Sequence, residues 1–398
     1  MEQEKIINNI QLSNEITSSL KNLMELWSEQ VVDKEYGGYL TCRNRDFSLY
    51  DTKKGAWGQA RHIWTYSMMA EFDHNNKDRW LGLAEVGIDF VINKMMCPNN
   101  RIAYLTDQKG AIIDGPISIF SDAFTILGIA KYISVSKGNR YISLLNKMFS
   151  TYVKNIQNTN FRDIAPNIFM PNVMHHAVYM ISVNCAYEVA SVLGKNTVQS
   201  FLEYCLNTVL TKFYDNEYGV VLEKKMLDGS RTHTSDSLFM NTGHVFESMW
   251  FALDATILLE KNELIPVIEQ ITENTFNLGT TDGLMTFSRT LGDKPSNYQT
   301  WKYELSFKDT DRVCWGYAEA MVLFIYLYKL TGKQKWFDRF LNHYQYVRNH
   351  FEDKKFGDWF HALDFNGKVI ADMKGSTVKD AYHIPRAYRK ILDILKEI

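Results

Sequence analysis

Hydrophobic side chains recur along this chain with the 3.6-residue period of the α-helix, and short polar segments rich in Gly, Asp and Asn interrupt them. The pattern predicts twelve helices, which fall into six pairs. They span residues 8–30, 56–74, 78–96, 119–136, 139–156, 173–193, 196–213, 243–261, 263–277, 314–331, 335–350 and 383–396. The length suggests two domains, but Pro numbers only 7 and no Ser/Gly-rich linker divides the chain, so we expect one domain over residues 1–398.

The interrupting segments share a pattern in which Asp is followed by an aromatic residue and Gly. Each such segment predicts a small β-hairpin with an Asp, Asn or Gly turn. A unit that recurs in this way indicates a repeat architecture, so we expect an all-α (α/α)6 barrel, a toroid of six helical hairpins with short β-hairpins in the loops at one end. The clearest examples are Asp33-Lys-Glu-Tyr-Gly-Gly-Tyr39, Asp215-Asn-Glu-Tyr-Gly219 and Asp353-Lys-Lys-Phe-Gly-Asp-Trp359.

Aromatic residues favour a closed barrel over an open α-solenoid. They make up 14% of the chain and gather at predicted helix starts and in the hairpins. A solenoid would not need this density, whereas a closed barrel has a central pocket that aromatic rings can line for sugar stacking. Ordinary core packing explains such residues about as well. The tryptophans concerned are Trp57, Trp64, Trp250, Trp301, Trp315 and Trp359.

Composition excludes several classes of protein. The formal charge is −2, and Lys and Arg are scattered along the chain, so we expect no nucleic-acid partner. No basic stretch is followed by an apolar one at the N-terminus, and no window is apolar over a membrane-spanning length. We therefore expect a cytoplasmic protein that does not bind a membrane. The cysteines lack CxxC spacing and are expected to be reduced core residues: Cys42, Cys97, Cys185, Cys205 and Cys314.

Candidate chemistry begins where a helix is predicted to start, in Asn241-Thr-Gly-His-Val-Phe-Glu-Ser-Met-Trp250. His244 and Glu247 are three residues apart and therefore share one helical face, while Gly243 favours a tight turn into the helix. Taken alone, the pair is explained more simply by a core histidine and a glutamate that interacts with the helix dipole. A second histidine in a similar setting, His383, favours a functional role.

Other polar residues also lie at the starts of predicted inner helices. Arg61 lies between two tryptophans at helical spacing, and a buried arginine needs an anion or several acceptors, a structural carboxylate being the alternative. Glu319 opens an otherwise apolar helix and must be paired or functional. His383 is followed one turn later by Arg386. Because the inner helices of a closed barrel face one axis, we expect these side chains to converge with His244.

Several separate motifs follow one another in order along the chain. They include Asp33-Lys-Glu-Tyr-Gly-Gly-Tyr-Leu-Thr-Cys42, Trp57-Gly-Gln-Ala-Arg61, Ser121-Asp-Ala-Phe124, Gly243-His-Val-Phe-Glu247, Trp315-Gly-Tyr-Ala-Glu-Ala320 and Tyr382-His-Ile-Pro-Arg-Ala387. Together they resemble the N-acylglucosamine 2-epimerase family, whose relatives include cellobiose 2-epimerases and mannose isomerases. The ending His383-Ile-Pro-Arg386 resembles the aminosugar epimerases. The resemblance implies an (α/α)6 barrel that interconverts N-acyl-D-glucosamine and N-acyl-D-mannosamine.

Epimerisation at C2 needs one acid–base group on each face of that carbon, because the proton removed from the ring-opened sugar must return to the opposite face. By the resemblance, His244 and His383 are this pair, and Arg61 stabilises the oxyanion that develops on O1. Glu247 and Glu319 would orient the histidines and bind hydroxyls. The residues implied in substrate binding are Arg386, Trp57 and Trp315. The segment 171–180 aligns in two ways, which leaves open whether His176 or Asn184 faces the pocket.

The resemblance implies no cofactor for the chemistry. No third ligand lies clearly in register with His244 and Glu247, so we expect no metal. Some relatives are activated by ATP, which leaves ATP as an allosteric activator open, as it leaves a homodimer open. The expected partner is a sugar or aminosugar.

Three alternatives stay open at this point. A mannose or other aldose–ketose isomerase, or a cellobiose 2-epimerase, would use the same two histidines on the same scaffold. An interaction protein of the renin-binding type would not need them. A glycoside hydrolase would place two carboxylates about the scissile bond, and the best-placed residues here include histidines instead.

Overall fold

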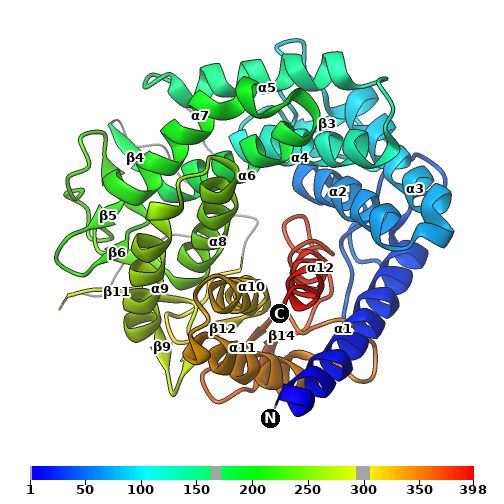
Figure 1. The fold of residues 1–398 in the computed structure, drawn as a ribbon. Coiled ribbons are helices and arrows are strands. Elements are labelled where there is room, and N and C mark those ends of the chain that lie inside the picture. The colour runs from blue at the N-terminus through cyan, green and yellow to red at the C-terminus, as the bar shows by residue number, and fades with distance from the viewer. Residues whose placement is uncertain (1, 162, 164–171, 293–304) are drawn as a thin grey trace.

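In the part of the chain that the structure describes, twelve α-helices form two concentric rings around a central axis, as the sequence predicts for an (α/α)6 barrel (Figure 1). The computed structural model describes residues 2–161, 163, 172–292 and 305–398, so Trp301 and residue 171 lie outside the described residues. The inner helices are α2 (Ala56–Phe72), α4 (Ile119–Ser136), α6 (His176–Leu193), α8 (Thr242–Leu258), α10 (Cys314–Thr331) and α12 (His383–Leu395). The outer helices are α1 (Glu2–Val31), α3 (Lys77–Phe90), α5 (Ile142–Gln157), α7 (Lys195–Asn207), α9 (Ile265–Gly279) and α11 (Gln334–Tyr346).

The inner ring is closed by the last helix of the chain. Each inner helix packs against the next one, and α12 lies between α10 and α2. From α2 onward each inner helix is followed by its outer partner, whereas α12 receives its outer partner from the other end of the chain, because α1 packs against it. The six helical pairs are therefore five consecutive hairpins and one pair made of the first and last helices (Figure 1).

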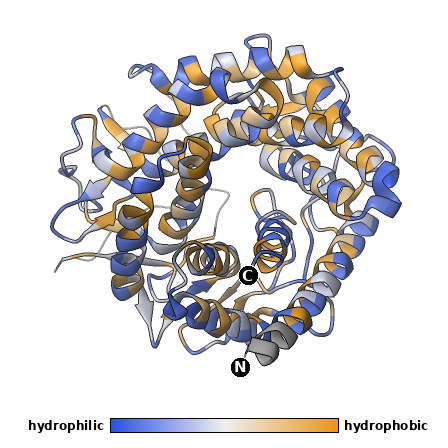
Figure 2. Ribbon diagram, in the orientation of Figure 1, coloured by the Kyte–Doolittle hydropathy of each residue, from blue (hydrophilic) through white to orange (hydrophobic). Residues whose placement is uncertain are grey.

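The predicted helices differ from the observed ones mainly at their ends. Three outer helices finish in a single π-helical turn, at Val91–Met95, Thr208–Lys212 and Val347–Phe351. The predicted helix 173–193 begins three residues later, because Val173–His175 forms a strand. Hydropathy explains the two rings: α4 and α8 are apolar nearly all round, whereas outer helices such as α5 alternate apolar and polar faces (Figure 2).

Helix α4 alone, among the residues that the structure describes, is long and apolar enough to cross a membrane by length and composition. However, 83% of this stretch is buried inside the protein. Its apolar surface is therefore accounted for by its place in the inner ring, between α2 and α6 and beneath α5.

Short strands fasten the inner helices at the end where those helices begin. The strand that precedes an inner helix pairs, antiparallel, with the hairpin that follows its outer helix: β1 with β2, β4 with β7, β8 with β11 and β12 with β13. A bridge between Arg43 and Gly375 makes the same link across the closing pair. The strands are β1 (Lys54–Gly55), β2 (Leu105–Thr106), β3 (Ile112–Asp114), β4 (Val173–His175), β5 (Tyr214–Asp215), β6 (Val220–Val221), β7 (Lys224–Met226), β8 (Phe239–Asn241), β9 (Thr280–Thr281), β10 (Leu284–Met285), β11 (Ser288–Thr290), β12 (Arg312–Val313), β13 (Ala362–Leu363) and β14 (Val369–Ala371).

The recurring Asp of the turn motif is a buried anchor. In all three clear examples its carboxylate accepts from the backbone N–H of its own turn and also binds a buried lysine from later in the same connection between helices. A buried carboxylate and a buried ammonium each compensate for the other's lost hydration. The pairs are Asp33 with Lys54 (2.8 Å), Asp215 with Lys225 (3.1 Å) and Asp353 with Lys374 (3.1 Å).

Removing one of these lysines should destabilise the barrel. The Lys54 ammonium is fully buried and has Asp33 as its carboxylate partner, so Lys54→Met leaves that carboxylate without its cation. We expect a loss of about 3–5 kcal/mol in the free energy of unfolding, measured by urea denaturation. The control is Lys195→Ala, which breaks the exposed pair with Glu260 and should change stability by less than about 1 kcal/mol. Equal effects in the two variants would contradict the anchoring role.

Candidate active site

A cavity opens at the end of the barrel where the inner helices begin, and all six inner helices contribute to its wall. Because every inner helix points its first turns to this end, residues far apart in the sequence meet there. The residues that α2, α4, α6, α8, α10 and α12 contribute include Trp57, Arg61, Phe124, Met180, His244, Glu247, Trp315 and His383. Connections between helices complete the wall with Glu223, Asn241, Phe287, Phe307, His361, Lys379 and Asp380, among others.

His244 is held at the first turn of α8 by contacts on both sides of the ring. The Asn241 side chain caps the helix by accepting from the backbone N–H of His244 at 3.1 Å. The imidazole Nδ1 lies 3.1 Å from a carboxylate oxygen of Glu223, which is buried in the connection between β6 and β7. Since the carboxylate accepts from Nδ1–H, the neutral ring carries its lone pair on Nε2.

The structure explains the glycine at position 243 differently from the tight turn that we predict from the sequence. Its backbone is ordinary helix, so no tight turn requires glycine. Instead, a Cβ at this position would lie 2.7 Å from the indole of Trp315 and 3.2 Å from the Cα of Gly316. The two glycines let α8 and α10 approach closely, with the Trp315 ring against the start of α8.

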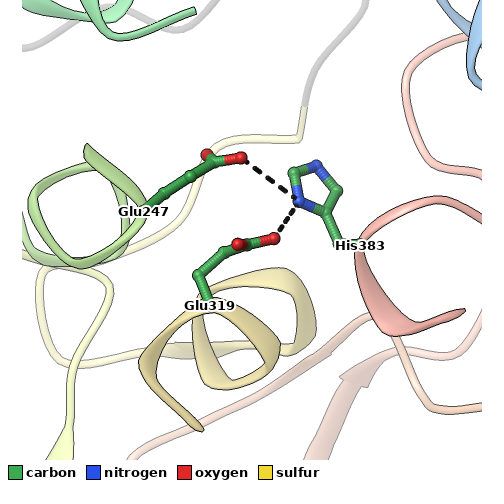
Figure 3. Close-up of side chains that lie close together, drawn as sticks. All are labelled: Glu247, Glu319 and His383. Atoms are coloured by element: carbon green, nitrogen blue, oxygen red, sulfur yellow. Dashed lines mark hydrogen bonds and ion pairs between the residues drawn. The ribbon is translucent and has the colours of Figure 1, made fainter. Parts of the chain in front are cut away.

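His383 is held in the same manner as His244, by a different carboxylate. Its Nδ1 lies 2.6 Å from Glu319 on α10 and 3.9 Å from Glu247 on α8 (Figure 3). Glu319 is fully buried and also accepts from the indole Nε1–H of Trp250 at 2.8 Å. The site thus contains two carboxylate–histidine pairs.

Trp315 brings the two histidines together. Its ring centroid lies 5.2 Å from the imidazole of His244 and 5.6 Å from that of His383. Both imidazoles therefore lie next to one indole in the wall of a single cavity, and their centres can be no farther apart than the sum of these distances. Both are partly exposed, with 23% and 17% of their side chains accessible.

Arg386 lies beneath His383 and holds both glutamates. Its Nη2 donates to Glu247 and, at 2.8 Å, to Glu319, and lies 3.4 Å from Nδ1 of His383. Glu247, Glu319 and His383 place ligand atoms close enough together for a metal ion. However, one guanidinium nitrogen already shares those same atoms, so a cation would have to displace the arginine from them. The donor set does not fit a metal, in line with the absence of one from the expected chemistry.

The two pairs differ electrostatically. Burial would raise the pKa of Glu223, but His244 and His176 outweigh it and hold that pKa well below its usual range. Burial raises the pKa of Glu319 in spite of Arg386. For His383, burial together with the positive charges of Arg61 and Arg386 lowers the pKa well below its usual value, although Glu247 opposes this. His383 is therefore a neutral imidazole at neutral pH.

Arg61 enters the cavity from the first turns of α2. Its Nη1 donates to the backbone oxygen of Val378 at 3.0 Å and lies 3.6 Å from the carboxylate of Asp380. Its guanidinium carbon lies 4.1 Å from the centre of the Phe124 ring, and the rings of Trp57 and Tyr382 are next to it. A cation enclosed by aromatic rings is poorly hydrated and acts strongly on nearby negative charge.

Three predicted substrate-binding residues, His176, Asn184 and Arg386, are not among the described residues that line the cavity. His176 is fully buried; its Nε2 lies 3.0 Å from the hydroxyl of Ser248 and its Nδ1 lies 3.8 Å from Glu223, so it supports the carboxylate of His244 from behind. Asn184 is buried farther along α6 and is not among the described residues that line the cavity. Glu247 contacts Arg386 rather than orienting His244, which is done by Glu223.

Sequence reasoning missed Glu223 and Asp380. The available signal for Glu223 was an acidic residue directly after the apolar run Val220-Val-Leu222 in a hairpin. Asp380 follows Lys379 in a polar connection and resembles a surface residue in sequence, yet its side chain is fully buried. Both belong to connections, where helical periodicity says nothing about burial.

The chain is similar in sequence to known sugar epimerases along most of its length. The chain is 24% identical over 395 residues to the N-acylglucosamine 2-epimerase of Mus musculus, covering 96% of this chain and 91% of that one. It is 21% identical over 385 residues to the cellobiose 2-epimerase of Dictyoglomus turgidum, covering 89% and 91%.

The solved structure of the cellobiose 2-epimerase from Spirochaeta thermophila superposes with a TM-score of 0.84 at 18% identity, covering 98% of each chain. A D-mannose isomerase superposes with a TM-score of 0.77 at 17% identity, covering 96% of this chain and 97% of that one. At these identities the likeness shows the (α/α)6 fold. The sequence profile of N-acylglucosamine 2-epimerase (GlcNAc 2-epimerase) matches residues 38–387, and the chain therefore belongs to the N-acylglucosamine 2-epimerase family.

Proposed function

We propose that this protein is a sugar 2-epimerase that interconverts N-acyl-D-glucosamine and N-acyl-D-mannosamine. The observation that carries the proposal is the pair of imidazoles, His244 and His383, both next to Trp315 in one cavity, each with a carboxylate on Nδ1. That arrangement offers two Nε2 atoms to one substrate carbon. The name of the mouse relative, N-acylglucosamine 2-epimerase, supports the choice of sugar.

The proposed reaction moves one proton off C2 and one proton back. After the ring opens, C2 lies next to the C1 aldehyde, so one histidine can take the C2 proton while the charge passes to O1. The other histidine then donates a proton to the opposite face of C2, the aldehyde re-forms and the configuration is inverted. The neutral state of His383 suits it to the role of base, and the ionised Glu223 favours a protonated His244 as the acid. In the reverse direction the two roles exchange.

Arg61 is proposed to stabilise the negative charge on O1. Among the described residues, the hydrogen bond of this guanidinium runs from Nη1 to the backbone oxygen of Val378. Its other N–H groups are therefore left for a ligand. Preorganised donors in a cavity from which water is largely excluded stabilise a developing oxyanion strongly.

The proposed chemistry involves no change of oxidation state and calls on no cofactor. ATP as an allosteric activator and a homodimeric assembly belong to the same proposal. A cytoplasmic location is proposed with them, on the hydropathy pattern of the sequence. A mannose isomerase or a cellobiose 2-epimerase on this scaffold would use the same histidines, so the choice of sugar is tested together with the mechanism.

Deuterium exchange tests the reaction directly. The wild-type protein in D2O should introduce deuterium at C2 of N-acetylmannosamine as N-acetylglucosamine forms, followed by NMR with mannose and cellobiose in parallel. His244→Ala and His383→Ala should each lower epimerisation roughly 100- to 10,000-fold, because each removes the acid–base group on one face. His74→Ala, at an exposed histidine, is the control. Near-normal turnover in either site variant would rule out the two-histidine mechanism.

A conservative change at Arg61 separates oxyanion stabilisation from substrate binding. Arg61→Lys keeps the charge but loses the planar fork, so kcat should fall about 100- to 1000-fold with comparatively little change in KM. Steady-state kinetics on N-acetylmannosamine provide the measurement. If KM rises while kcat stays intact, Arg61 binds the substrate and another donor meets the oxyanion.

Replacing Glu223 tests whether its carboxylate is needed for the proposed role of His244. Glu223→Gln keeps the size but removes the charge that stabilises the protonated imidazole, so kcat should fall by up to the 100- to 10,000-fold expected for losing the acid itself. Glu217→Gln, at an exposed glutamate in the same connection, should leave kcat unchanged. A fall of less than about threefold in Glu223→Gln, measured with N-acetylmannosamine, would show that His244 works without this carboxylate.

A further inference from the structure

One corner of the cavity holds buried polar atoms that the mechanism does not use. Nε of Arg61, Nε1 of Trp57 and both carboxylate oxygens of Asp380 are buried and have no hydrogen-bond partner among the described residues. The three residues are at most 8% exposed and all belong to the cavity wall. Leaving such groups unpaired is costly, so a protein keeps them where a ligand can pair with them.

The atoms without a hydrogen-bond partner include both donors and acceptors. Arg61 and Trp57 present N–H donors, and the guanidinium carbon lies 5.5 Å from the Trp57 ring. Asp380 presents acceptors and lies 3.6 Å from Nη1 of Arg61. A ligand group that satisfies this corner must offer an acceptor and a donor next to each other. A secondary amide does so, because its carbonyl oxygen accepts and its N–H donates.

The corner also has an apolar wall. The Trp57 ring centroid lies 5.6 Å from that of Phe120 and 5.8 Å from that of Phe124, and both phenylalanines line the cavity. A short acyl group attached to the amide would pack against these rings. A sugar hydroxyl in the same place would satisfy Asp380, but it would not reach the N–H donors of Arg61 and Trp57 and would not cover the rings.

The position of this corner relative to the reacting carbon, C2, is consistent with its binding the substituent on C2. If Arg61 meets O1, as the proposed function requires, then the substituent on the neighbouring carbon, C2, lies beside Arg61. Asp380 is the carboxylate that lies beside Arg61. An amide N–H on a buried carboxylate forms a charge-assisted hydrogen bond, which is stronger than one between neutral groups.

We propose that Asp380, Trp57 and Nε of Arg61 form the subsite for the C2 N-acyl group, in which Asp380 accepts from the amide N–H and thereby selects N-acylated aminosugars over hexoses. This inference rests on the proposed function for the placement of O1. It makes Asp380 a specificity-determining residue rather than an acid–base catalyst.

The protonation state of the Asp380 carboxylate should depend on pH. Burial raises the pKa of Asp380 to about 6, against the positive charges of Arg61, Lys379 and Arg386, which lower it. Asp380 is therefore ionised above about pH 6 and protonated below. Affinity for the amide should fall as pH drops through this value, and Asp380→Asn should abolish that dependence.

Binding of a non-reactive ligand tests the subsite apart from catalysis. N-acetylglucosaminitol keeps the open chain and the amide but has no aldehyde, and glucitol lacks the amide. By calorimetry, the wild-type protein should bind the first more tightly, and Asp380→Asn should weaken that binding about 10- to 100-fold. Asp372→Asn, at an exposed aspartate on a nearby connection, is the matched control and should bind as the wild type does. Equal affinity of the wild type for the two alditols, or unchanged binding by Asp380→Asn, would overturn the proposal.

Trp57→Phe keeps the aromatic wall and removes only the N–H donor, so it tests the carbonyl half if Asp380→Asn fails to fold. It should weaken binding of N-acetylglucosaminitol and leave glucitol unaffected, whereas a merely structural effect would weaken both. Wild-type turnover separates this inference from the proposed function. A protein that epimerises N-acetylmannosamine but binds the amide without Asp380 refutes the subsite alone. A protein that binds N-acetylglucosaminitol through Asp380 and epimerises no sugar refutes the proposed reaction alone.

Discussion

The arrangement of the site depends on one buried cation. Arg386 reaches from α12 to Glu247 on α8 and Glu319 on α10, so a single side chain joins three of the six inner helices. Two carboxylates buried this close together repel one another, and the positive charge of Arg386 between them offsets that repulsion. The same contact places Glu319 under His383 and thereby fixes the orientation of the imidazole.

The barrel geometry adds a second electrostatic contribution. All six inner helices begin at the cavity, so the partially positive ends of their dipoles face it. Such an environment favours an anionic intermediate and disfavours a second cation, which agrees with the lowered pKa of His383. The hairpins and their buried Asp–Lys anchors hold the same end of the molecule rigid, so the field is preorganised rather than assembled by the substrate.

Much of this could be predicted from the sequence, and the exceptions have a common physical origin. The twelve helices follow from 3.6-residue periodicity, and the convergence of Arg61, His244, Glu319 and His383 follows from ring closure. Helix α6 is apolar on nearly every face, so the pattern does not say which face meets the cavity, and neither His176 nor Asn184 is among the described residues that line it. Glu223 and Asp380 reach the site from connections whose paths depend on strand pairing and long-range packing, which no local pattern encodes.

Closure of the ring by its last helix has a consequence for synthesis of the chain. The ribosome releases α1 first, yet its packing partner, α12, emerges only after all the other inner helices. Until then the inner helices α2 and α10 each lack a neighbour, and their apolar sides are open to solvent. The nascent protein therefore passes through a state in which the ring is incomplete and these apolar helix faces are exposed. Exposed apolar surface of this kind favours aggregation, which chaperones prevent. The cavity is complete only when α12 is in place, because α12 carries His383.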